Sequence, residues 1–129
     1  MFASLLLSAA LDASQPAQSA YTSVNPIQVA SCSISQTPAW ESFFGYSTSA
    51  GTPETAISFV NTKQTAVTSV VFEVTEGNRS SRIVDKGNFS NGVTINHTYE
   101  TPELGASLGD VSCAVQSVAF ADGSTWQAQ

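Results

Sequence analysis

The segment 56–74, AISFVNTKQTAVTSVVFEV, constrains the fold more than any other part of the chain. Its apolar residues alternate with polar ones on both sides of a polar stretch at 61–66, and a period of two is typical of strands with one buried face. The polar stretch is too short for a helical crossover, so we expect the two runs to pair as an antiparallel hairpin. A hairpin with one apolar face needs a second sheet to cover it. The segment therefore predicts a β-sandwich.

Similar short runs recur along the chain, separated by turn residues. A change of phase near Ala30–Ser31 and another at Gln116–Ser117 predict β-bulges. The expected fold class is all-β, a two-sheet antiparallel β-sandwich with six or seven strands and one disulfide. The expected strands are at about residues 24–35, 55–61, 67–75, 80–85, 93–99, 111–121 and 124–128. The turn dipeptides are Gly77-Asn78, Gly87-Asn88, Asn91-Gly92 and Asp122-Gly123, the last favouring a type I′ turn.

The length of 129 residues suits one domain with its own core. Residues 2–11, FASLLLSAAL, have the apolar character and length of a signal-peptide core, and QPAQSA at 15–20 offers small residues for cleavage. No Lys or Arg precedes the apolar run, so 1–20 is either a signal peptide or a disordered tail. We expect 21–129 to be a single β-sandwich domain. No apolar run is long enough for a membrane-spanning helix.

The two cysteines, Cys32 and Cys113, lie near opposite ends of the chain and do not form a C-x-x-C motif. We expect them to form one disulfide bond. In the chain-entropy model, closing a loop of about 80 residues stabilises the fold by about 4 kcal/mol. Because such bonds persist in oxidising compartments, we expect the protein to be secreted or periplasmic.

The formal net charge of −6 argues against polyanionic partners. Binding to nucleic acid or to an anionic membrane surface requires several Lys or Arg on one face. We therefore expect no nucleic-acid partner and no membrane span. The four basic residues are Lys63, Arg79, Arg82 and Lys86.

Residues 37–55 form the least regular part of the sequence, and we expect a long loop there because glycine and proline interrupt it. Four aromatic residues lie in it: Trp40, Phe43, Phe44 and Tyr46. We favour the interpretation that Trp40 and Phe43 close the open end of the sandwich. The alternative is that the aromatic loop 38–46 is a surface that stacks on sugars or anchors a protein partner.

The sequence offers no set of residues for catalysis. It lacks G-x-S-x-G, H-E-x-x-H and a glycine-rich phosphate loop, and His97 is its one histidine. His97 lies on the apolar parity of the strand VTINHTY, where a structural role is expected. The carboxylates Glu100, Glu103 and Asp110 lack the spacing of a calcium loop. We therefore predict no catalytic residues, no metal site and no cofactor, although carboxylates from distant strands could still pair to hydrolyse sugars.

ISFVNTK at 57–63, followed by VTSVVFEV at 67–74, resembles a pattern common in exported immunoglobulin-like and fibronectin-type-III-like bacterial modules. FADGSTW at 120–126 is similar to the ends of small secreted bacterial proteins. The resemblance implies an immunoglobulin-like sandwich, and a fold does not carry a function with it.

The expected function is that of a non-enzymatic exported structural or protein-interaction domain, with an unknown protein or glycan as partner. The alternative is a carbohydrate- or ligand-binding module that uses the aromatic loop 38–46, and an enzyme of unknown type is the third candidate. Asn78, Asn88 and Asn96 lie in N-x-S/T sequons, which would be glycosylated only in a eukaryotic secretory pathway.

Overall fold

The computed structural model describes residues 24–41, 44–105 and 110–129. The expected signal peptide or tail at 1–20 and the aromatic residue Phe43 lie outside these ranges. The described residues form nine strands. These are β1 (Ile27–Ser35), β2 (Trp40–Glu41), β3 (Ser47–Thr48), β4 (Glu54–Asn61), β5 (Val67–Glu76), β6 (Arg79–Phe89), β7 (Thr94–Glu100), β8 (Val111–Phe120) and β9 (Thr125–Gln127).

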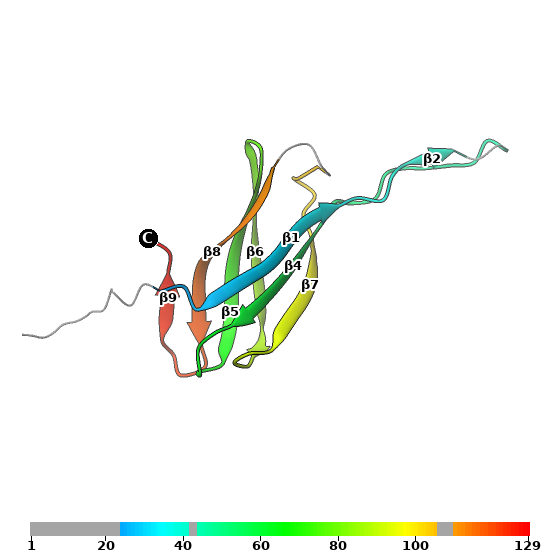
Figure 1. The fold of residues 1–129 in the computed structure, drawn as a ribbon. Coiled ribbons are helices and arrows are strands. Elements are labelled where there is room, and N and C mark those ends of the chain that lie inside the picture. Colours follow the sequence, from blue (N-terminus) through cyan, green and yellow to red (C-terminus); the bar gives the residue numbers. More distant parts are fainter. Residues whose placement is uncertain (1–23, 42–43, 106–109) are drawn as a thin grey trace, which may run out of the picture.

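Two sheets pack against each other to form the body of the protein (Figure 1). One has the strand order β1-β4-β7 and the other the order β6-β5-β8-β9, and neighbouring strands in both are antiparallel. Strands are present at all seven expected positions. The prediction of an all-β, two-sheet antiparallel sandwich is therefore confirmed.

The expected hairpin over 56–74 is wrong, because β4 and β5 lie in different sheets. β4 has β1 and β7 as its neighbours, whereas β5 has β6 and β8. Residues 62–66 cross from one sheet to the other, so the apolar faces of β4 and β5 meet across the core. The rings of Phe59 on β4 and Phe72 on β5 pack edge-to-face with centroids 5.2 Å apart. Alternation reveals that a strand has a buried face but does not reveal its neighbours.

The buried side chain of Asn61 holds this crossing between the sheets. Its Nδ2 donates hydrogen bonds to the carbonyl oxygens of Thr65, at 2.9 Å, and Phe89, at 3.0 Å. Its Oδ1 accepts a hydrogen bond from the backbone N–H of Lys63 at 2.8 Å. An asparagine that is fully buried must satisfy its polar atoms inside the protein. The three bonds fix where β4 ends and the chain leaves its sheet.

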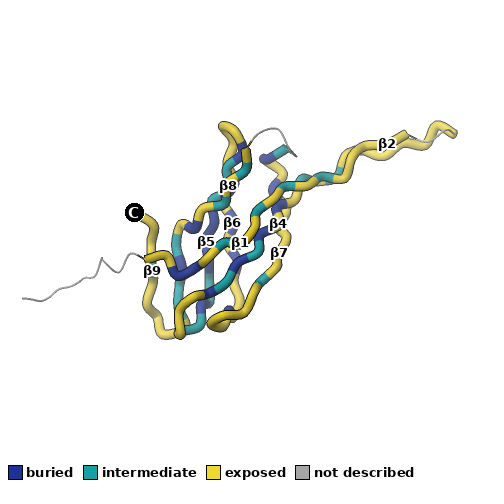
Figure 2. Tube along the Cα trace, in the orientation of Figure 1, coloured by how far each residue is buried: buried dark blue, intermediate teal, exposed yellow. Residues whose placement is uncertain are grey.

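The core lies between the two sheets, where the inward-facing residues of the central strands are buried (Figure 2). Phe59 lies at its centre and also packs edge-to-face against Phe89, with ring centroids 5.3 Å apart. Such aromatic pairs stabilise a core beyond the area that they bury. The buried cluster consists of Ile27, Ile57, Phe59, Val67, Val70, Phe72, Val74, Ile83, Phe89, Leu104, Val115 and Val118.

Both expected bulges are present. The β1–β4 register shifts between Val29 and Ser31, and the β5–β8 register skips Gln116. The extra residue of each bulge shifts the alternation of its strand by one position. Apolar residues before and after the bulge therefore face the same core. The interpretation of Gly87-Asn88 as a turn is wrong, because these residues lie within β6. They form a bulge there, because Val67 of β5 pairs with Phe89 and Ser69 pairs with Lys86. The two positions are therefore two residues apart on β5 but three apart on β6.

The turn between β8 and β9 differs from the expected type I′ turn. The N–H of Gly123 donates to the carbonyl of Phe120 at 3.0 Å, so Ala121 and Asp122 are the central residues. Gly123 follows them with a φ of 89°, in the left-handed region that favours glycine. This is the three-residue loop that ends in a glycine bulge.

The predicted disulfide bond between Cys32 and Cys113 is confirmed. It joins β1 of one sheet to β8 of the other, with Cα atoms 6.1 Å apart across a sequence separation of 81 residues. That Cα distance is within the normal range for disulfides. The bond therefore links the first strand of one sheet to the last long strand of the other.

Candidate functional site: an aromatic arm

Residues 36–41 and 44–53 form an arm that projects from the sandwich (Figure 1). It continues β1 and β4 beyond their sheet as a two-stranded ribbon in which Trp40 pairs with Thr48 and Glu41 with Ser47. The sequence predicted an irregular loop here, because serine, threonine, glycine and proline dominate its composition. The structure instead carries the antiparallel pairing of β1 and β4 outward.

Hydrogen bonds at the base of the arm set its direction. The N–H of Gly51 donates to the carbonyl of Thr37 at 2.8 Å, and Gln36 Nε2 donates to the carbonyl of Gly51 at 2.8 Å. A Cβ added at Gly51 would lie 3.2 Å from the Cβ of Thr37, so a glycine permits this close approach. The two sides of the arm are thus tied together where they leave the sandwich.

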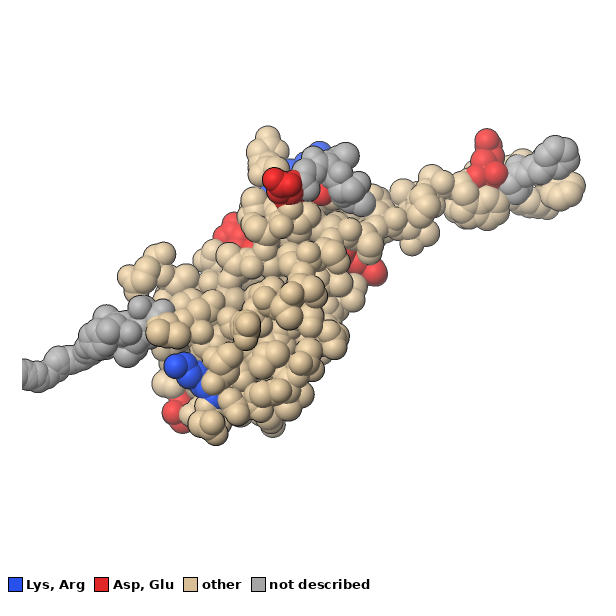
Figure 3. All heavy atoms as spheres, in the orientation of Figure 1, with Lys and Arg blue, Asp and Glu red and all other residues tan. Residues whose placement is uncertain are grey.

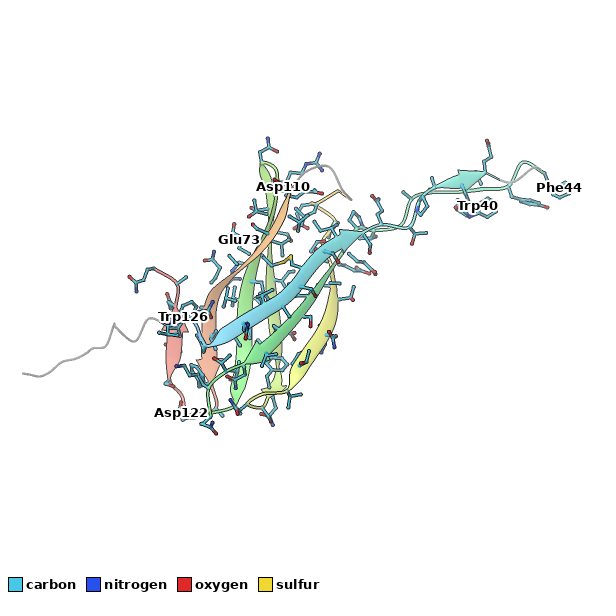
Figure 4. All side chains as sticks on the ribbon, in the orientation of Figure 1. Trp40, Phe44, Glu73, Asp110, Asp122 and Trp126 are labelled. Carbon is cyan, nitrogen blue, oxygen red and sulfur yellow. A yellow bond between two sulfur atoms is a disulfide. The ribbon has the colours of Figure 1, made fainter. Side chains whose placement is uncertain are left out.

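Three large aromatic side chains are exposed on the arm. Trp40 is 52% exposed, Phe44 is 82% exposed and Tyr46 is 72% exposed. Figure 4 shows Phe44 at the far end of the arm and Trp40 on its shaft. The preferred interpretation, in which Trp40 and Phe43 close the sandwich, is therefore wrong for Trp40, and Phe43 lies outside the described residues.

Other residues close the end of the sandwich from which the arm leaves. Leu104 is buried there, and its N–H donates to the carbonyl of Thr101 at 3.0 Å. The hydroxyls of Thr55 and Thr101, both fully buried, are joined by a 2.8 Å hydrogen bond. Because Leu104 and this threonine pair seal the core, the aromatic residues of the arm are not required to do so.

A second cluster joins the outer edges of the two sheets. Asp85 on β6 accepts hydrogen bonds at the same oxygen, Oδ2, from His97 Nδ1 at 2.6 Å and from the Tyr99 hydroxyl at 2.5 Å. Both donors lie on β7, in the opposite sheet. Burial, the hydrogen bond to Asp85 and the negative charge of Asp85 together raise the pKa of Tyr99 well above its usual range.

This cluster contains the residues that would matter most to an enzyme. The His97 side chain is 44% exposed, and its hydrogen bond within the described residues goes to Asp85. A histidine held by a carboxylate acts in acyl transfer on a hydroxyl or thiol that is hydrogen-bonded to it. The hydroxyl of this cluster, that of Tyr99, donates to Asp85 instead. The sequence predicted a structural role for His97 but not its contact with Asp85, because β6 and β7 are not neighbours in any one sheet.

No known family's sequence profile matches the chain, and neither a curated protein sequence nor a solved structure matches it. The resemblance to exported immunoglobulin-like modules therefore stays an expectation. Within the part of the chain that the structure describes, no helix has the length and apolar character needed to cross a membrane.

Proposed function

We propose that this protein is a non-enzymatic interaction domain that binds a protein partner through the aromatic residues of its arm. The observation that carries the proposal is the exposure of Trp40, Phe44 and Tyr46 on a segment that leaves the sandwich. The core of the body is closed beside the arm by the buried Leu104. The arm thus presents large aromatic side chains to solvent, away from the core.

The free energy of binding would come from covering these rings. Burying a phenylalanine side chain completely stabilises a complex by about 1.5–3 kcal/mol, and Phe44 at 82% exposure retains most of that surface. Tryptophan and tyrosine are also enriched among the residues that dominate protein interfaces. We therefore expect a few aromatic residues of the arm to supply most of the binding free energy, rather than many weak contacts over a broad surface.

An immunoglobulin-like classification and export are part of this proposal. The three-plus-four strand arrangement supports the first, as does the crossing of the chain from β4 in one sheet to β5 in the other. The disulfide differs from that of antibody domains, because it begins on the first strand, β1, rather than on the second. A disulfide within the sandwich supports export to an oxidising compartment.

Carbohydrate binding by the same arm is the second candidate function. It is favoured by the exposed rings of Trp40 and Tyr46, which could stack on sugar rings. A sugar would need one or two rings and adjacent polar groups, whereas a protein partner would also cover Phe44 at the tip. The two candidates therefore differ in their dependence on Phe44.

Photo-crosslinking tests the proposal. A benzoylphenylalanine at position 44 should crosslink to one protein in the fluid or cell surface where the chain resides, and the same group at Val93, an exposed site on the body, should not. Trp40→Ala and Tyr46→Ala should abolish the crosslink, whereas Ser47→Ala should preserve it. Crosslinking that is equal at the two positions would contradict the proposal. Binding on a glycan array that Trp40→Ala removes and Phe44→Ala does not would favour the second candidate.

A further inference from the structure

A pocket of about 300 Å³ lies at the start of β1, beside β9. Its walls include an indole, a phenyl ring and one ammonium group. A cavity of about 150 Å³ can hold a benzene ring, so this pocket has room for one aromatic side chain and part of the backbone beside it. The lining includes Val24, Pro26, Lys63, Phe120, Thr125 and Trp126.

One charged group of this pocket is unmatched within the described part of the chain. No carboxylate among the described residues lies within ion-pair distance of the exposed Lys63. The apolar walls suit an aromatic ring, and Lys63 suits a negative charge. The pocket therefore suits an occupant that brings an aromatic ring and a carboxylate.

The arm carries both features. Phe44 supplies an exposed ring at the tip, and Glu41 supplies a carboxylate. Glu41 is the one charged residue in the segment 36–53. Figure 3 shows acidic atoms on the projecting arm. Because Glu41 is next to Trp40 in β2, its side chain lies on the opposite face of the ribbon.

The arm and the pocket lie at opposite ends of the body. The pocket includes Val24 and Pro26, which precede β1, whereas the arm begins after β1 ends at Ser35. Nine extended residues of β1 separate the two by about 30 Å. Figure 4 shows Trp126 on one side of the body and Phe44 far beyond the other. An arm that points away from its own pocket can enter only the pocket of another molecule.

We propose that the partner of the arm is a second copy of this chain, whose pocket at β9 receives Phe44 while its Lys63 pairs with Glu41. This inference rests on the proposed function of the arm. The contact joins two different surfaces, so a pair of molecules keeps one free arm and one free pocket. A contact of this kind adds molecules head to tail and closes only if the rotation between them permits.

The test measures the mean molar mass of the full chain over a range of concentrations by sedimentation velocity. The mass should rise above that of the monomer, and Phe44→Ala should weaken association by roughly 30-fold, the effect of losing one dominant interface residue. Thr125→Trp should do the same by filling the mouth of the pocket. Ser47→Ala on the arm and Gln127→Trp on β9 are the matched controls and should leave association unchanged.

Mixing the variants provides the sharper measurement. The Phe44→Ala chain has an intact pocket and the Thr125→Trp chain an intact arm, so a mixture should form a one-to-one complex that grows no further. A symmetric arm-to-arm contact would give no such rescue. The charge exchange Glu41→Lys with Lys63→Glu should restore the association that each single change weakens.

Three results would overturn the inference. These are a monomer at every concentration, association that Thr125→Trp leaves intact, and a mixture of the two variants that stays monomeric. Association lost in Phe44→Ala but unchanged in Thr125→Trp would contradict the pocket and leave the arm as the binding surface. A monomer whose arm still crosslinks to another protein would likewise overturn this inference and preserve the proposed function.

Discussion

Removing the disulfide should destabilise the sandwich more than any single loss on its surface. The perturbation is the double variant Cys32→Ala and Cys113→Ala. The two residues are 81 positions apart, and in the chain-entropy model closing a loop of that length lowers the free energy of the native state relative to the unfolded state by about 4.5 kcal/mol. Domains of this size are stable by about 5–15 kcal/mol in total, so the loss is a large fraction.

The assay is urea unfolding followed by circular dichroism, with the free energy of unfolding extrapolated to water. Wild-type protein measured in a reducing agent should match the double variant, because both lack the same covalent link. Ser112→Ala, an exposed change next to Cys113 on β8, is the matched control and should unfold like wild type. A loss below about 1 kcal/mol would refute the argument, since the bond would then constrain the unfolded chain far less than its loop length requires.

Two further predictions concern the polar groups between the sheets. Asn61→Asp replaces two buried N–H donors with an oxygen that faces the carbonyls of Thr65 and Phe89, so urea unfolding should show a loss of at least about 2 kcal/mol. Equal stability would show that these bonds do not hold the crossing. The raised pKa of Tyr99 means that the native state keeps a proton that the unfolded chain loses, so stability should fall as the pH rises above about 10. Tyr99→Phe should flatten that fall, and an unchanged pH profile would contradict the role given to Asp85 as its acceptor.

The sequence predicts the strands well because alternation is a local property. The runs at β4 and β5 have the expected period, and a phase change within β8 located the bulge at Gln116. The disulfide was also predictable, since Cys32 and Cys113 are the two cysteines of the chain. The strand and bulge predictions need only residues that are neighbours in the sequence. The disulfide prediction has one possible pairing, because the chain has two cysteines.

Pairing and exposure were harder to predict because they depend on distant parts of the chain. The hairpin over 56–74 failed, since the hydrogen bonds of Asn61 that hold the crossing reach as far as Phe89. Trp40 was expected to close the sandwich because nothing in the sequence shows that Leu104 does so. The contact between Asp85 and His97 likewise joins two strands of different sheets.

The proposed binding function depends most on the arm holding its aromatic residues in solvent. Trp126→Phe leaves Trp40 as the one tryptophan, and acrylamide quenching of its fluorescence in dilute, folded protein measures its exposure directly. Acrylamide should quench the half-exposed Trp40 readily in the native protein, and its emission should be typical of an indole in contact with water. A native Trp40 that is shielded from acrylamide and emits at short wavelength would contradict the arm and the binding function built on it.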